Sequence, residues 1–167
     1  RVDAQGVSLT LDEVDRSTWD PGLLRGGLAD AAVAARREGR FALEAAISGL
    51  HSVAPTLEQT DWTQIVLLYE GLARLWPSPA VDVARLAAQA QLVLAEDADL
   101  TPVEHGLQRL ANEGPSYARR DAAFALADLC WRSGRRDEAA GRYRELARKV
   151  DDDAVRLFCL RRAGEEG

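Results

Sequence analysis

The sequence has no methionine, and it is poor in the residues that hold metals or drive catalysis. Its 167 residues include only two histidines, His51 and His105, and two cysteines. Cys130 and Cys159 stand far apart in the sequence, so there is no CxxC pair and no local set of zinc ligands. We therefore expect no metal site and no cofactor. Both thiols should be buried as small hydrophobic side chains in a reducing compartment.

A long hydrophobic run is also missing. No apolar stretch approaches the ~20 residues that a membrane-spanning helix needs, and the first residues lack the apolar segment of a secretory signal. The net charge of −6 argues against a surface that binds nucleic acid directly. These features predict a cytoplasmic protein that contacts no membrane. Because the chain opens without methionine, we expect it to be a piece of a longer protein.

Strand signals are scarce, whereas helix signals recur together with their start and stop residues. Proline after a capping residue marks starts at 20–21, 78–79 and 101–102, and glycine or proline marks ends. Segment 1–14 is expected to be irregular, although it contains a short alternating run. The expected helices cover residues 21–37, 41–53, 61–76, 79–94, 101–113, 117–132, 137–149 and 151–163. Seven or eight helices joined by short loops pack as antiparallel neighbours. The sequence thus predicts an all-α array of helical hairpins in one domain, 1–167.

The residues around Gly134 favour a tetratricopeptide-like hairpin. In such a hairpin, small and aromatic residues stand at set distances on both sides of a glycine turn. With Gly134 as the turn, these positions are taken by Leu126, Ala127, Cys130, Ala139 and Tyr143. The expected helix at 61–76 has an apolar face of a similar kind, formed by Trp62, Ile65, Tyr69, Leu72 and Trp76.

Catalytic partners are hard to find in this sequence. His51 and His105 fall on different expected helices, and neither has a nucleophile and an orienting group beside it. We expect His105 to be exposed, and His51 to be packed and bonded to backbone rather than to act as a base. No catalytic residue is predicted, and the chain is not expected to be an enzyme.

The stretch from residue 119 to 148 is rich in arginine, with aspartate and glutamate interleaved. An ion-paired, solvated surface is the simplest interpretation of this pattern. A protein-docking face is the main alternative, and direct nucleic-acid binding comes third because Trp131 and Tyr143 fit a helix interface better than a stacking platform.

Three local patterns, taken in order, resemble a known family. They are the segment Asp15–Asp20, which reads Asp-Arg-Ser-Thr-Trp-Asp; the segment Gly39–Ile47, followed by His51; and the segment from Thr60-Asp61-Trp62 through Tyr69 to Pro77-Ser78-Pro79. Together with the arginine-rich turn Gly134–Ala140, they resemble the tetratricopeptide-like C-terminal extension of a group of extracytoplasmic-function (ECF) RNA polymerase sigma factors. The resemblance extends over nearly the whole chain.

The resemblance implies a regulatory, protein-binding part of a transcription initiation factor. The partners it implies are sigma regions two and four of the same chain, core RNA polymerase, or a small protein with an Asp-Gly-Pro-Phe motif. Promoter DNA would be read by domains outside these residues. The alternative is a free-standing tetratricopeptide-like adaptor without a transcriptional role. The candidate partner-contact residues are Asp15, Arg16, Trp19, His51, Asp61, Trp62, Tyr69, Pro77, Ser78, Pro79, Arg135 and Arg136.

Overall fold

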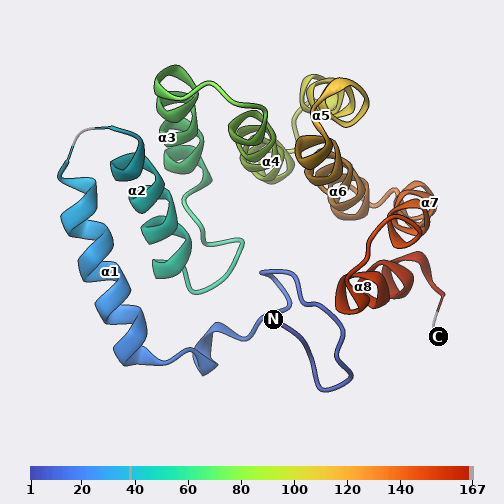
Figure 1. Cartoon of the computed structure of the whole chain (residues 1–167), viewed down its shortest axis with the longest axis horizontal. Coiled ribbons are helices and arrows are strands. Elements are labelled where there is room, and N and C mark those ends of the chain that lie inside the picture. The colour runs from blue at the N-terminus through green and yellow to red at the C-terminus, as the bar shows by residue number, and fades with distance from the viewer. Residues whose placement is uncertain (38, 166–167) are drawn as a thin grey trace. The chain divides into compact units, whose positions relative to one another are not determined.

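The computed structural model describes residues 1–37 and 39–165, and this part of the chain folds into eight α-helices and one short 3₁₀ helix, with no β-strand (Figure 1). The expected all-α array of antiparallel hairpins is confirmed. The elements are η1 (Arg16–Thr18), α1 (Pro21–Ala35), α2 (Arg40–Val53), α3 (Trp62–Leu75), α4 (Pro79–Ala95), α5 (Thr101–Glu113), α6 (Ser116–Arg132), α7 (Arg136–Ala147) and α8 (Asp153–Ala163).

Short polar side chains start several of these helices, as the sequence predicts. Asp20 accepts hydrogen bonds from the backbone N–H groups of Gly22 and Leu23 at 2.7 and 2.9 Å, and Pro21 is the first residue of α1. Asp61 caps α3 and Asp152 caps α8 in the same way. Such a cap contributes about 0.5–2 kcal/mol because it satisfies a backbone donor that has no partner inside the helix.

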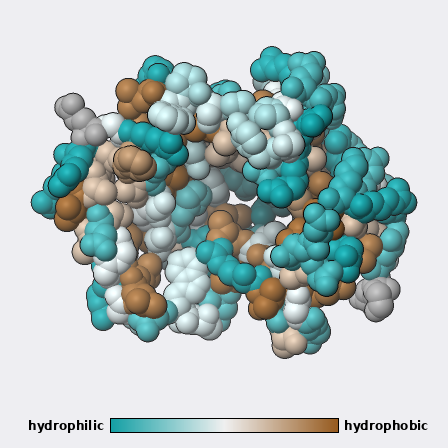
Figure 2. Space-filling model, in the orientation of Figure 1, coloured by the Kyte–Doolittle hydropathy of each residue, from teal (hydrophilic) through white to brown (hydrophobic). Residues whose placement is uncertain are grey.

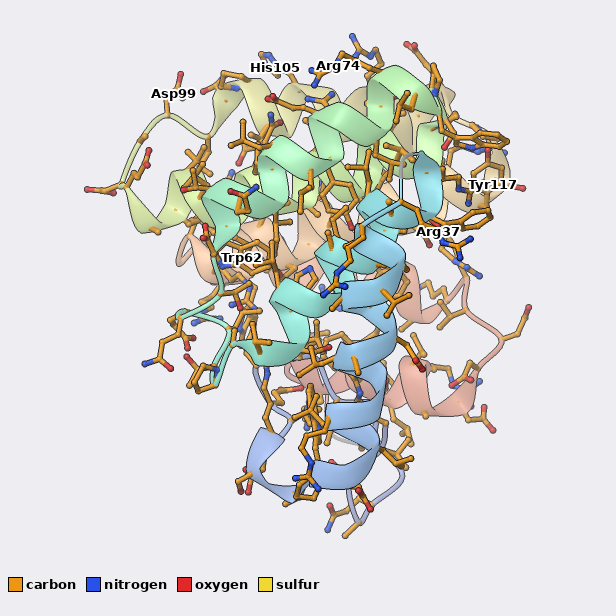
Figure 3. The ribbon with its side chains drawn as sticks, turned by 90° about the vertical axis from the view of Figure 1, so that its left-hand side faces the viewer. Arg37, Trp62, Arg74, Asp99, His105 and Tyr117 are labelled. Carbon is orange, nitrogen blue, oxygen red and sulfur yellow. The ribbon has the colours of Figure 1, made fainter. Side chains whose placement is uncertain are left out.

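The prediction that Thr101 caps α5 is wrong. Thr101 is already the first helical residue, and the carboxylate of Asp99 accepts a hydrogen bond from its backbone N–H at 2.9 Å. Figure 3 shows Asp99 on the loop before α5 and His105 on the helix, with both side chains directed outward. His105 is exposed, as expected.

The contacts within the chain divide it into two compact units. The first unit is Leu11–Leu92, and the second unit is Arg1–Thr10 together with Val93–Gly167. The sequence predicts one domain over residues 1–167. The two units are a finer division of the chain, and the single domain stays a prediction. None of the described helices is both long and apolar enough to cross a membrane.

The core of the first unit lies between α2, α3 and α4. Ile65 and Leu72 are buried there, together with Ile47 of α2 and Val81 and Ala88 of α4. The helix α1 packs beside α2 but buries none of its own residues.

The prediction that Trp76 belongs to the buried apolar face of α3 is wrong. Trp76 lies beyond the end of the helix, with φ −140° and ψ 73°, and 50% of it is exposed. Once the chain leaves helical geometry, the side chain of Trp76 no longer follows the buried face.

The second unit is built from α5 to α8, in which each helix packs on the next. Its core confirms the predicted hairpin around Gly134. Tyr143 is 1% exposed, and its ring meets that of Phe158 edge-on at 5.5 Å between centroids. The small residues Ala127 and Ala139 are fully buried and let α6 and α7 approach closely. Both cysteines are buried in the same core, as expected.

The first ten residues belong to the second unit. The backbone N–H of Ser8 donates to the carbonyl oxygen of Ala154 at 3.0 Å, Asp3 pairs with Arg161, and Val7 packs against the core. The only β-type pairing among the described residues is an isolated bridge between Val2 and Ser8. This segment is irregular, as predicted, yet it is held against the last helix.

Candidate interaction site

Residues from all three sequence patterns meet in the first unit. The guanidinium of Arg16 donates from Nη1 to the carbonyl oxygens of His51, at 3.0 Å, and Ala54, at 2.6 Å. These carbonyls lie at the end of α2, where no intrahelical donor remains for them. A cation is favourable there because it also meets the negative end of the helix dipole. Arg16 thereby fastens the segment before α1 to the end of α2.

Aromatic rings surround this contact. The ring of Trp62 meets that of His51 edge-on, with 5.3 Å between centroids, and its Nε1 donates to the carbonyl oxygen of Leu57 at 3.1 Å. Figure 3 shows Trp62 at the start of α3. The Arg16 guanidinium carbon lies 5.7 Å from the ring of Trp19. We call Arg16, Trp19, His51 and Trp62 the Arg16 cluster.

The flanking acids shape the backbone of the cluster. Asp15 accepts hydrogen bonds from the hydroxyl and the backbone N–H of Ser17, and these bonds lower the pKa of its carboxyl group. It thereby caps η1, while Asp61 caps α3 just before Trp62. Both carboxylates act as caps in the structure.

The environment of His51 favours the neutral imidazole. Burial lowers the pKa of His51, and the positive charge of Arg16 lowers it further. Its Nδ1 is buried without a hydrogen-bond partner among the described residues, so the expected bond to backbone is not made by this atom. The charged group that acts on His51 is a cation, whereas a catalytic base is usually oriented by a carboxylate. These surroundings fit a neutral His51 ring that packs against Trp62.

Tyr69 and Ser78 lie at a second place in the same unit. They line a groove of about 270 Å³ between α2, α3 and α4, together with Arg40, Glu44 and Trp76. Arg40 pairs with Glu44 at 2.8 Å, and its guanidinium carbon lies 4.6 Å from a ring of Trp76. Burial raises the pKa of Tyr69, and Glu44 adds to the shift.

Pro77, Ser78 and Pro79 shape the link between α3 and α4. The hydroxyl of Ser78 accepts from the backbone N–H of Val81 at 3.3 Å, and Pro79 is the first residue of α4. Pro77 is exposed between the two helices. The geometry gives these three residues the loop and capping roles that their residue types favour.

Arg135 and Arg136 stand at the turn between α6 and α7. Arg135 pairs with Glu104 of α5 and with Glu138 of α7, and so links these two helices within the second unit. The guanidinium carbon of Arg136 lies 3.7 Å from the ring of Trp131. Gly134, with φ +79°, permits this turn because a left-handed backbone disfavours side chains with a Cβ.

Many other charges of the arginine-rich stretch are paired, as the simplest interpretation of the sequence predicted. Arg132 pairs with Asp128, Arg142 with Glu138, Arg144 with Glu165 and Arg120 with Asp121. Hydrophilic side chains cover most of the face of α5 to α8 that Figure 2 shows. Each exposed pair contributes only about 0–1 kcal/mol.

A groove that sequence reasoning missed lies in the second unit. It has a volume of about 490 Å³ and is formed by the end of α5, the first half of α6, and α7 with the turn that follows. Its charged lining residues are Arg119, Arg120, Arg142, Lys149 and Glu145. We call it the basic groove. No periodic pattern in the sequence indicates this groove, because its cations come from two helices and a turn.

The structure therefore separates the candidate residues into three groups. Asp15, Arg16, Trp19, His51, Asp61 and Trp62 lie at the Arg16 cluster, Tyr69 and Pro77 to Pro79 lie at or beside the 270 Å³ groove, and Arg135 and Arg136 lie in the second unit. Among the described residues, no group of three or more histidine, cysteine, aspartate or glutamate side chains is placed to hold a metal ion.

Comparison with known proteins gives one informative similarity. The chain is 43% identical, over 90 residues, to an uncharacterised protein of Rhizobium meliloti (strain 1021). These residues make up 53% of the chain but 21% of that protein, so the chain spans about a fifth of the relative's length. No family model matches the chain. No solved structure matches it either.

Proposed function

We propose that the chain is the C-terminal regulatory and protein-interaction domain of an ECF-type RNA polymerase sigma factor that acts in transcription initiation. It contributes by contact with a protein partner, without chemistry of its own. Sigma regions two and four of the same chain, core polymerase and a small Asp-Gly-Pro-Phe-motif protein are the partners to test. Promoter DNA is bound by the other domains of the factor, in the cytoplasm.

The observation that supports this proposal best is the Arg16 cluster. Its members come from the three patterns on which the resemblance rests, at positions 16 and 19, 51, and 62. They pack against one another in the first unit. Because these residues depend on each other for packing, their joint presence is a more specific family mark than any one short motif.

The relative from Rhizobium meliloti fits a domain within a larger protein. The matched part is 21% of that protein, which leaves most of its length for other domains. In the proposed factor, that remaining length would hold the regions that bind polymerase and promoter.

Two observations test the proposal against the free-standing adaptor. The reading frame upstream of Arg1 should encode a helix-turn-helix of sigma region four, and the tagged full-length product should co-purify with core RNA polymerase. A start codon close to Arg1, together with no polymerase in the eluate, would favour the adaptor.

A further inference from the structure

The basic groove concentrates positive charge in a protein whose net charge is −6. Four cations and one carboxylate line it. Arg120 and Arg142 are already paired with Asp121 and Glu138. Arg119 and Lys149 are exposed and form no ion pair with any residue that the structure describes. Glu145 also forms no ion pair among the described residues and offsets one of these charges, so the groove keeps a small net positive charge.

The groove also presents apolar surface. Between its cations lie Ala111, Ala123, Leu146 and Val150. Its volume of about 490 Å³ falls in the range of sites that bury organic ligands, roughly 300–1,000 Å³. An inorganic anion would use the cations and leave the apolar surface uncovered. A ligand that carries both carboxylates and apolar side chains would cover both.

Several acidic residues of the chain itself are engaged within the fold. Asp99 accepts from the backbone of Thr101, Asp152 caps α8, Asp153 pairs with Arg156, and Glu165 pairs with Arg144. A second copy of the chain could offer the exposed Glu96 and Asp97, which form no ion pair among the described residues, so self-association is a separate outcome of the test. Two copies that each carry a net charge of −6 repel each other, and the complementary acids are better supplied by a segment of a different protein.

Nucleic acid fits the groove less well than an acidic peptide. The net charge of −6 repels a long polyanion. No aromatic ring is among the lining residues, so bases would have no stacking surface there.

From these observations we propose that the basic groove binds an acidic, partly apolar peptide segment of a partner protein. Its carboxylates pair with Arg119 and Lys149, and its apolar side chains cover Leu146 and Val150. The inference does not depend on the link to transcription, because a free-standing adaptor would have the same groove.

The test uses the whole chain and a fluorescent probe peptide in which glutamates alternate with leucines. Fluorescence anisotropy measures its Kd for the wild-type chain and for the charge-reversed variant Arg119→Glu/Lys149→Glu. We expect the variant to bind about tenfold more weakly or worse, because two attractions become repulsions. The milder variant Arg119→Gln/Lys149→Gln should show a smaller loss of affinity. It replaces the charge-reversed variant in the test if that chain does not fold.

A matched control changes the same net charge elsewhere. Arg25 and Arg109 are exposed, form no ion pair among the described residues, and do not line the basic groove. Arg25→Glu/Arg109→Glu should leave the Kd within about twofold, because neither residue lines the groove and exposed charges outside the contact are screened by salt. A probe with glutamine in place of glutamate should not bind.

Several outcomes would overturn the proposal. One is equal weakening of probe binding by Arg119→Glu/Lys149→Glu and by the control Arg25→Glu/Arg109→Glu, and another is no binding of the acidic probe. Tighter binding of a single-stranded oligonucleotide than of the probe would also overturn it, as would self-association of the chain that is lost in Arg119→Glu/Lys149→Glu. Failure of the chain to act in transcription would leave this proposal untouched.

Discussion

The guanidinium of Arg16 donates to the carbonyl oxygen of His51, 35 residues later in the sequence, at 3.0 Å. A second bond, to Ala54, has a length of 2.6 Å. Together they place a positive charge at the end of α2 and beside the ring of His51.

Replacing Arg16 should destabilise the first unit. Arg16→Ala removes both hydrogen bonds and leaves two carbonyl groups at the end of α2 without this donor. Since hydrogen bonds to charged groups contribute about 1.5–3 kcal/mol, we expect a loss of roughly 1–3 kcal/mol. Tryptophan fluorescence during urea unfolding reports on this unit, because three of the four tryptophans, Trp19, Trp62 and Trp76, belong to it.

The exposed Arg25 provides the control for this measurement. Arg25→Ala should change the unfolding midpoint little, by less than about 0.5 kcal/mol in free energy. If Arg16→Ala were as mild as Arg25→Ala, the contact between Arg16 and the end of α2 would have no stabilising role.

Acidification should destabilise the first unit through His51. Burial and Arg16 hold the pKa of His51 below its ordinary value of 6.5. The unfolded state therefore binds more protons than the folded state, and the free energy of unfolding rises with pH across this interval. Full stability is present above about pH 6.5 and is lost as the pH falls from there towards the depressed pKa.

The pH profile can be assigned to one residue by substitution. His51→Gln should flatten the dependence of the urea midpoint between roughly pH 5 and 7, where few other groups titrate. His105→Gln, at an exposed position, should leave the profile as it is. A profile that His51→Gln does not alter would mean that protonation of His51 costs the fold nothing.

The ring of Tyr143 should be the most costly single side chain to remove from the second unit. It is 1% exposed and packs against Trp131 and Phe158. Tyr143→Ala should cost about 3–5 kcal/mol, since it leaves a cavity in a packed core. Tyr117→Ala, at a residue that is 50% exposed, should cost less than about 0.5 kcal/mol. Urea unfolding followed by circular dichroism compares the two, and similar midpoints would contradict the described core.

Both thiols should be inert in the folded protein. Burial raises the pKa of Cys159 to about 11 and also raises that of Cys130. Because the thiolate is the reactive form, Ellman's reagent should react with neither at neutral pH until urea unfolds the chain. Rapid modification of either cysteine without urea would show that this core opens readily.

Much of the fold could be predicted from local signals. Asp20-Pro21 and Asp61 mark helix starts by chemistry that acts within a few residues, and the spacing around Gly134 identifies Tyr143 as a core residue. The start of α5 is harder to predict, because Asp99 and Thr101 both carry a suitable oxygen; Leu100 takes the cap position, and the backbone N–H of Thr101 donates to Asp99.

The same local signals could not predict the tertiary contacts. The sequence motifs contain Arg16 and His51, but nothing in their spacing indicates that one side chain reaches the backbone of the other. The basic groove needs the packing of α6 against α7 before Arg119 and Arg142 line one surface. Trp76 follows the apolar periodicity of α3 and is nevertheless half exposed, since the helix ends at Leu75.

The central claim is that this chain regulates transcription initiation as part of a sigma factor, and single-round transcription with purified components tests it most directly. Core RNA polymerase and a target promoter are combined with the full-length factor or with the same factor truncated before Arg1. The account predicts that truncation changes both the yield of initiated transcripts and the affinity for polymerase. Equal yields and equal affinities, from two equally well folded proteins, would contradict it.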